Sequence, residues 1–188
     1  MLATELDGEA SVLLTKRAST MSTHRGDWVF PGGRVHDQQG EPSIEAACRE
    51  TEEEVGIGRD RIDVVGQLFS HGPIITGFVI DVFVGVTSSL AGLRPDPREV
   101  DELLVLPLSA FMTPESFHRG GVPDQYRPEP SLVGAGFVTS AGVAPGVGTP
   151  VSPSLERFRV RGDEELWGTQ GAILYELLAH LTATRLAH

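Results

Sequence analysis

Three glutamates, Glu50, Glu53 and Glu54, lie close together in the sequence with the spacing of one helix face. On a helix that advances by about 100° per residue, they fall within a sector of about 100°. Like charges at these spacings repel one another, so a compensating cation is expected. Hard divalent cations such as Mg²⁺ prefer oxygen ligands and are often shared between carboxylates and substrate phosphates. The three glutamates are therefore candidate metal ligands.

An arginine is spaced to hold these carboxylates. Arg49 precedes Glu53 by four residues and follows Glu45 by four, so its guanidinium can reach either carboxylate. Side chains that orient the ligands are common in metal sites. The alternative is a solvent-exposed acidic helix face with stabilising ion pairs, because charge runs of this kind are common. These residue types alone leave both interpretations open.

The helix that must carry the glutamates is visible in the apolar pattern. Small and apolar residues recur at helical spacing through this segment, which predicts one buried stripe. Gly56 follows as a C-terminal cap. The residues of the stripe are Ile44, Ala47, Cys48, Thr51 and Val55.

The rest of the chain favours strands and one further helix. Asp7-Gly8 is typical of a tight hairpin turn, so a β-hairpin is expected near the start. Pro31 should end a strand and open a loop of special shape at Gly32 and Gly33. Expected strands span 1–6, 11–15, 28–30, 62–69, 74–86 and 103–106, and the second helix spans 172–186. Strands and helices do not alternate regularly, so the predicted class is α/β of the α+β type, with a mixed sheet.

Length and composition predict a single domain over residues 1–188, because 40% of the residues are hydrophobic and 22% are charged. Gly and Pro make up 13 of the 34 residues at about 120–153. This composition resists regular structure and predicts an insertion. The segment is either a loop that contacts substrate or an inert surface excursion.

Charge and cysteine content restrict partners and compartment. A net charge of −11 disfavours binding to nucleic acid or to a membrane surface. One cysteine, Cys48, excludes an internal disulfide and is compatible with a reducing compartment, so a cytoplasmic location is expected. We recognise no targeting or membrane-spanning segment. The expected partner is a small molecule, and formation of a homodimer is left open.

The stretch from Pro31 to Ile57 resembles the box of the Nudix hydrolases, in which a glycine and a glutamate precede R-E-x-x-E-E-x-G and an apolar residue. The first part departs from the pattern, since seven residues separate Gly33 from Glu41 where the family has five. The resemblance implies the Nudix fold, a mixed β-sheet sandwiched between helices. The positions that match in register are Glu41, Arg49, Glu50, Glu53, Glu54, Gly56 and Ile57.

The resemblance also implies a reaction and residue roles. Nudix enzymes hydrolyse a diphosphate linkage in nucleoside diphosphate derivatives, using Mg²⁺ or Mn²⁺ and a metal-activated water. The three glutamates of the helix face would bind the metal ion, and Glu53 among them would act in catalysis. Arg49 and Glu41 would orient these groups. Glu99 resembles the distal acid that many members use as an extra ligand or base, although it could equally be an exposed loop acid.

The segment Leu13–Gly33 resembles the one that marks coenzyme A diphosphatases, with L-L-T-x-R, then H-x-G, then F-P-G-G. The resemblance implies that Arg17, His24 and the Gly32-Gly33 loop contact the substrate. Ser22 stands where the subfamily commonly has an arginine. The implied reaction cleaves coenzyme A or an acyl-CoA to 3′,5′-ADP and 4′-phosphopantetheine or its acyl form.

Two alternatives remain open. The chain could hydrolyse ADP-ribose or another nucleoside diphosphate sugar, because Pro73 lies sixteen residues after Ile57 and resembles a proline typical of ADP-ribose hydrolases. It could also be a non-catalytic Nudix-type nucleotide-binding domain. Such domains tend to lose carboxylates of the box, and all three are present here.

Apolar positions within the expected elements predict the core. Trp28 and Trp167 have two interpretations, stacking on an adenine ring or simple packing. The predicted core residues are Leu13, Ile44, Val55, Ile57, Val64, Phe78, Ile80, Phe83, Leu104, Leu106, Leu174 and Leu178.

Overall fold

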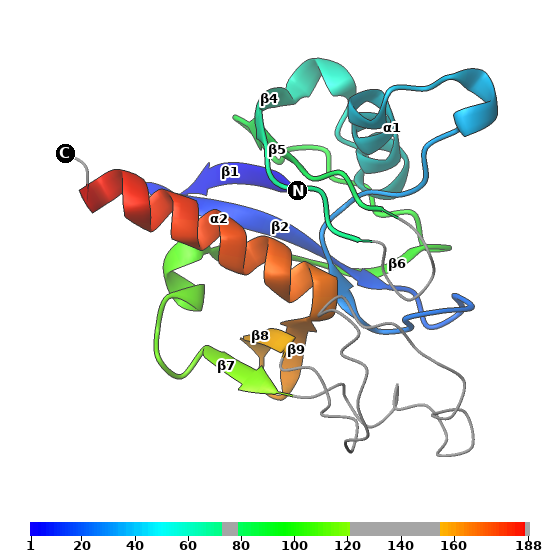
Figure 1. Cartoon of the computed structure of the whole chain (residues 1–188). Helices are drawn as coiled ribbons and strands as arrows, with labels where there is room; N and C mark the ends of the chain where they lie inside the picture. The colour runs from blue at the N-terminus through cyan, green and yellow to red at the C-terminus, as the bar shows by residue number, and fades with distance from the viewer. Residues whose placement is uncertain (73–78, 121–154, 187–188) are drawn as a thin grey trace, which may run out of the picture.

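A computed structural model describes residues 1–72, 79–120 and 155–186 (Figure 1). The predicted insertion at about 120–153 lies outside the described residues except for Gly120, and so does the predicted core residue Phe78. The single domain with that insertion therefore stays a prediction. None of the helices in the described ranges is long and apolar enough to cross a membrane.

The chain begins with the predicted β-hairpin. Strands β1 (Leu2–Leu6) and β2 (Glu9–Arg17) pair antiparallel, and Leu6 lies opposite Glu9. Asp7 and Gly8 form the two-residue turn with φ of 53° and 79°. Positive φ at both turn residues matches the right-handed twist of the strands, which is why Asp-Gly favours this connection.

The main sheet has six strands and is mixed, as predicted. Its further strands are β3 (Trp28–Val29), β4 (Asp63–Gln67), β5 (Phe83–Thr87) and β6 (Val100–Pro107). Strand β2 pairs antiparallel with β1, β3 and β6, whereas β1 pairs parallel with β5, which pairs antiparallel with β4. The strand predicted over 74–86 was too long. Residue Ile80 forms only an isolated bridge with His71.

Helices cover both faces of this sheet. Helix α1 (Ser43–Val55) ends at Gly56, whose φ of 79° confirms the predicted cap. Helix α2 (Gly168–Leu186) begins four residues before the predicted start. Alternate residues of β2 point to opposite faces, so Leu13 packs with α1 while Val12 and Leu14 pack with α2. The predicted sandwich is confirmed.

A second, three-stranded antiparallel sheet was not predicted. It consists of β7 (Phe117–Gly120), β8 (Leu155–Arg161) and β9 (Glu164–Trp167), in the order β7-β8-β9. Figure 1 shows these strands beside α2, and Phe158 and Leu166 belong to the same buried cluster as Leu174 of α2. The described residues also include three short 3₁₀ helices, at Asp37–Gln39, Arg59–Arg61 and Leu108–Phe111.

The predicted core is largely confirmed. Of the predicted residues, Leu13, Val55, Ile57, Leu174 and Leu178 are buried, and Ile44, Val64, Ile80, Phe83, Leu104 and Leu106 are half-buried. The packing interpretation of Trp28 is also confirmed. Its side chain is buried, and its indole N–H donates a hydrogen bond to Glu164 at 3.1 Å. Trp167 is half-buried.

Candidate functional site

Arg49 forms a hydrogen-bonded network on α1. Its Nε and Nη2 donate to the two carboxylate oxygens of Glu41 at 2.8 and 3.2 Å. Its Nη1 donates to Glu50 at 2.9 Å and to Glu53 at 3.1 Å, and Nη2 also donates to the carbonyl oxygen of Arg34 at 2.9 Å. One guanidinium therefore orients two of the predicted ligands, because its planar fork presents several donors at once.

Glu41 is the anionic anchor of this network. The Arg49 guanidinium and the His36 backbone N–H, which donates at 2.9 Å, lower the pKa of Glu41 to about 2. Glu41 is therefore fully ionised at neutral pH. The long loop between Gly33 and Glu41 is held at both ends by Arg49. Glu45, the other carboxylate within reach of Arg49 by spacing, lies instead beside Arg59, with 3.6 Å between Nε and Oε1.

Glu54 is the buried carboxylate of the site. Its side chain faces inward from α1 and only 5% of the residue is exposed. The Gly32 N–H donates a hydrogen bond to it at 3.1 Å. Burial, together with the charges of Glu50 and Glu99, raises the pKa of Glu54 to about 7, against the opposing effects of the Gly32 hydrogen bond and of Arg17. Glu54 thus lacks sufficient positive charge around it.

Residues Phe30–Gly33, here called the glycine loop, lie directly against the acidic face. A Cβ atom placed on Gly33 would lie 2.0 Å from a carboxylate oxygen of Glu50, which no real side chain tolerates. Only glycine at position 33 allows this approach. The backbone of the glycine loop therefore meets the carboxylates of Glu50 and Glu54.

Glu99, the predicted distal acid, lies in a turn just before β6. The preceding segment is fixed to the end of α1, because the N–H of Arg94 donates to Val55 O at 2.9 Å and that of Asp96 to Glu54 O at 3.0 Å. These bonds satisfy carbonyls that a helix end leaves free. Glu99 is exposed, and its charge contributes to the raised pKa of Glu54.

The structure places Arg17 near Glu54 and joins it to the segment that carries His24. Arg17 ends β2, and two backbone hydrogen bonds of 3.0 Å fix it to Gly26 and Asp27. Its charge lowers the pKa of Glu54, and its Nε is buried without a hydrogen-bond partner in the described part of the chain. His24 adopts a left-handed φ of 55°, and its Nδ1 lies 3.0 Å from an Asp27 carboxylate oxygen.

Comparison with known proteins identifies the family. A family model described as "NUDIX domain" matches residues 2–128. The chain belongs to the Nudix family. This result confirms the family predicted from the box at Pro31–Ile57.

Several Nudix relatives resemble the chain. "Uncharacterized Nudix hydrolase NudL" of Photorhabdus laumondii is 36% identical over 110 residues, covering 57% of each protein. "Nudix hydrolase 3" of Caenorhabditis elegans is 36% identical over 110 residues, covering 57% of this chain and 45% of the relative. The chain spans about half the length of these curated relatives. The crystal structure of a C. elegans Ap4A hydrolase binary complex is 20% identical, with a TM-score of 0.47, and the match covers 57% of this chain and 76% of that one.

The donor set of this Nudix box fits a hard divalent cation. Three carboxylates share one helix face, and the buried one, Glu54, has too little positive charge around it. They do not form a closed set of ligands, since no three His, Cys, Asp or Glu side chains in the described ranges are grouped closely enough to hold a metal ion. The carboxylate of Glu53 is 60% exposed and bonds to Arg49. The chemistry of the donors fits, and the exposed Glu53 carboxylate is held by a single bond to Arg49.

One residue that contacts the glycine loop is not predicted by any sequence pattern. Gln170, in the first turn of α2, accepts a hydrogen bond from the Phe30 N–H at 3.1 Å. No local pattern marks this residue, since its partner lies 140 positions away in the sequence. Only the packing of α2 on the sheets brings the two together.

Proposed function

We propose that this Nudix chain hydrolyses a diphosphate linkage in a nucleoside diphosphate derivative. The observation that carries the proposal is the set of box carboxylates beneath the glycine loop, with Glu54 buried among acidic groups. Glu50, Glu53 and Glu54 would hold Mg²⁺ or Mn²⁺. When bound, the cation would neutralise charge on the diphosphate and lower the pKa of a water molecule.

The protein groups have separate tasks in this proposal. Arg49, fixed by Glu41, keeps Glu50 and Glu53 oriented on the helix face. The proton of the attacking water passes to a carboxylate, for which Glu53 and Glu99 are the candidates because both are exposed at the site. The water oxygen adds to phosphorus and the bridging P–O bond breaks, so two phosphomonoesters leave.

We propose coenzyme A or an acyl-CoA as the substrate, giving 3′,5′-ADP and 4′-phosphopantetheine or its acyl form. In the segment Leu13–Gly33, the L-L-T-x-R and H-x-G parts lie together, because Arg17 forms backbone hydrogen bonds with Gly26 and Asp27 beside His24. The buried Nε of Arg17 is an available donor, and a guanidinium suits a phosphate group. Arg17, His24, Gly32 and Gly33 would contact the substrate.

The alternative substrate is ADP-ribose or another nucleoside diphosphate sugar. Its support is the position of Pro73, which lies outside the described residues. The chain spans about half the length of its curated relatives, so its activity should be measured directly on this chain.

The test is product analysis by mass spectrometry with purified protein. The substrates are coenzyme A, ADP-ribose, NADH and diadenosine polyphosphates, each with Mg²⁺ or Mn²⁺ and with a chelator as control. Release of 4′-phosphopantetheine and 3′,5′-ADP well above all other products supports the proposal. Preferred cleavage of ADP-ribose replaces the proposed substrate, and no turnover with either metal favours a nucleotide-binding domain.

A further inference from the structure

The glycine loop is held from two sides. On one side, the Gly32 N–H donates to Glu54 of α1 at 3.1 Å. On the other, the Phe30 N–H donates to the side-chain oxygen of Gln170 of α2 at 3.1 Å. These donors are two residues apart, so the loop spans the space between the two helices that cover opposite faces of the sheet. Its placement over Glu50 and Glu54 therefore depends on α2 as well as on the box.

The position of Gln170 is itself tightly fixed. Strand β9 passes into α2 without a connecting residue, because Gly168 adopts a φ of 60° that favours glycine. Gly171, which follows Gln170, approaches β8 so closely that a Cβ placed on it would lie 2.2 Å from the carbonyl oxygen of Glu156. Ile173 and Leu174 then enter the buried cluster. The start of α2 therefore has little freedom to shift along the sheet.

We propose that Gln170 is a positioning residue for the Nudix site, which sets the glycine loop against Glu54 and Glu50 and so determines cation binding and turnover. It lies outside residues 2–128 that match the family model. Without an acceptor at position 170, the N–H of Phe30, a residue only 7% exposed, loses its partner. A buried donor without a partner is costly, so the loop moves toward solvent and Gly32 leaves Glu54. This inference rests on the proposed function for its effect on turnover but not for its effect on the loop.

Two substitutions separate the acceptor from the shape of the side chain. Gln170→Met is similar in length and helix propensity but has no comparable acceptor, whereas Gln170→Glu retains the accepting oxygen and places its charge in a first helical turn, where it is tolerated. Glu176→Met is the matched control. Glu176 lies on the same helix and accepts the Phe69 N–H at 2.9 Å.

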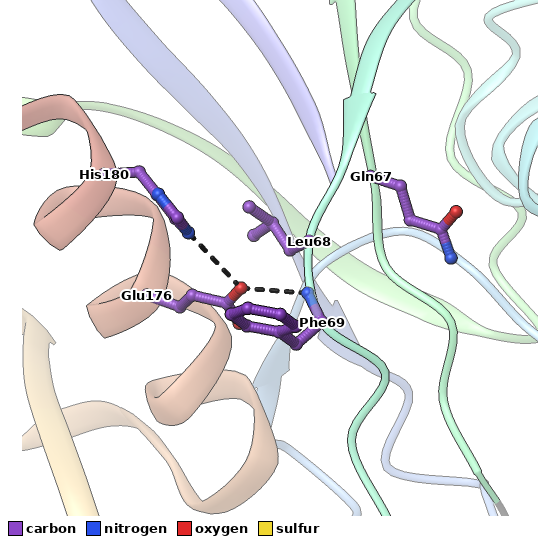
Figure 2. A pocket seen from close by; sticks show the side chains of 5 residues that line it. All are labelled: Gln67, Leu68, Phe69, Glu176 and His180. Atoms are coloured by element: carbon purple, nitrogen blue, oxygen red, sulfur yellow. Dashed lines mark hydrogen bonds and ion pairs between the residues drawn. The ribbon is translucent and has the colours of Figure 1, made fainter. Parts of the chain in front are cut away.

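Figure 2 shows that Glu176 accepts a hydrogen bond from the Phe69 N–H and pairs with His180 at 3.7 Å. These residues line a pocket of about 330 Å³ with Gln67 and Leu68. None of the predicted site residues lines this pocket. Glu176→Met thus removes a helix-to-loop acceptor at a place that does not include the box.

The first readout is amide hydrogen exchange at Gly32 in the metal-free protein. We expect exchange to be about tenfold faster in Gln170→Met, as for loss of one hydrogen bond, and unchanged in Gln170→Glu and Glu176→Met. The second readout is the Mn²⁺ dissociation constant by calorimetry together with kcat. Both should worsen at least about tenfold in Gln170→Met, equivalent to about 1.4 kcal/mol, and return to within about threefold of wild type in Gln170→Glu.

The outcomes distinguish this inference from the proposed function. If Gly32 exchanges faster in Gln170→Met but not in the other variants, the positioning role is supported. If the wild-type chain at the same time hydrolyses none of the substrates, the proposed function is contradicted. If the wild-type chain hydrolyses a substrate but Gln170→Met changes neither Gly32 exchange nor kcat, the positioning role is overturned and the proposed function stands. An equal effect in Glu176→Met also overturns it, since the change would then be a general loosening of α2.

Discussion

Replacement of the buried acid Glu54 by Gln should stabilise the metal-free protein at alkaline pH. Only 5% of Glu54 is exposed, and burial raises its pKa from 4.5 to about 7. The folded state therefore holds the proton more tightly than the unfolded state. This contribution to stability is fully present below pH 4.5 and is lost as the pH rises through about 7. Gln carries no charge to bury at any pH.

The size of the effect follows from the two pKa values. Each pKa unit corresponds to 1.36 kcal/mol, so the interval from 4.5 to about 7 amounts to up to about 3 kcal/mol. At pH 5, just above the unfolded-state pKa, Glu54→Gln should be more stable by less than about 1 kcal/mol. At pH 8 Glu54→Gln should be more stable by up to about 3 kcal/mol, and the Gly32 N–H retains an acceptor in the Gln side chain.

The measurement is urea unfolding at pH 5 and pH 8 with a chelator present, followed by repetition with saturating Mg²⁺. A cation that binds only the folded state should stabilise the wild type and so reduce the difference in unfolding free energy between wild type and Glu54→Gln. Glu52→Gln, an exposed position on the same helix, is the control and should change stability by less than about 0.5 kcal/mol at either pH. The assignment of Glu54 as a buried acid with too little nearby positive charge would be refuted by either of two results. In one, Glu54→Gln is less stable than wild type at pH 8. In the other, its free energy of unfolding differs from that of wild type by the same amount at both pH values.

Two further substitutions probe the same network. Gly33→Ala places a Cβ 2.0 Å from the Glu50 carboxylate, so Glu50 must move. The Mn²⁺ dissociation constant, measured by calorimetry, should rise at least about tenfold. An unchanged dissociation constant would show that the close approach of Gly33 to Glu50 is unimportant. Arg49→Lys keeps the charge but loses the fork that reaches three carboxylates. The pKa of Glu41 by NMR titration should rise from about 2 toward its ordinary range, and full turnover with an unchanged Glu41 pKa would contradict the role of Arg49.

The features that could be predicted from the sequence are those whose cause is local. Asp7-Gly8 defines its hairpin because the required positive φ values depend on those two residues alone. The stripe from Ile44 to Val55 and the cap at Gly56 likewise lie within one helix. The family was predictable because the residues of its box lie within one stretch of 27 positions, Pro31–Ile57.

The features that escaped prediction depend on distant partners. Strands β7 and β8 pair across the segment 121–154, so no short pattern links Gly120 to Leu155. The bond between Phe30 and Gln170 spans 140 positions. The spacing rule allowed Arg49 to reach Glu45 as well as Glu53, but Glu45 faces Arg59, whose position depends on the turn that follows α1. Tertiary packing decides between contacts that helical spacing permits equally.

The charges of the site determine which contact can be exchanged when a cation binds. Arg49 forms two bonds with Glu41, whose pKa of about 2 reflects a strong pairing. It forms one bond of 3.1 Å with Glu53, whose carboxylate is 60% exposed, and exposed ion pairs of this kind contribute little. Glu54 cannot move, because it is buried and bonded to Gly32. In the proposed cation site, Glu53 is therefore the carboxylate that would leave Arg49 and join Glu54, while Glu41 would keep the guanidinium in place.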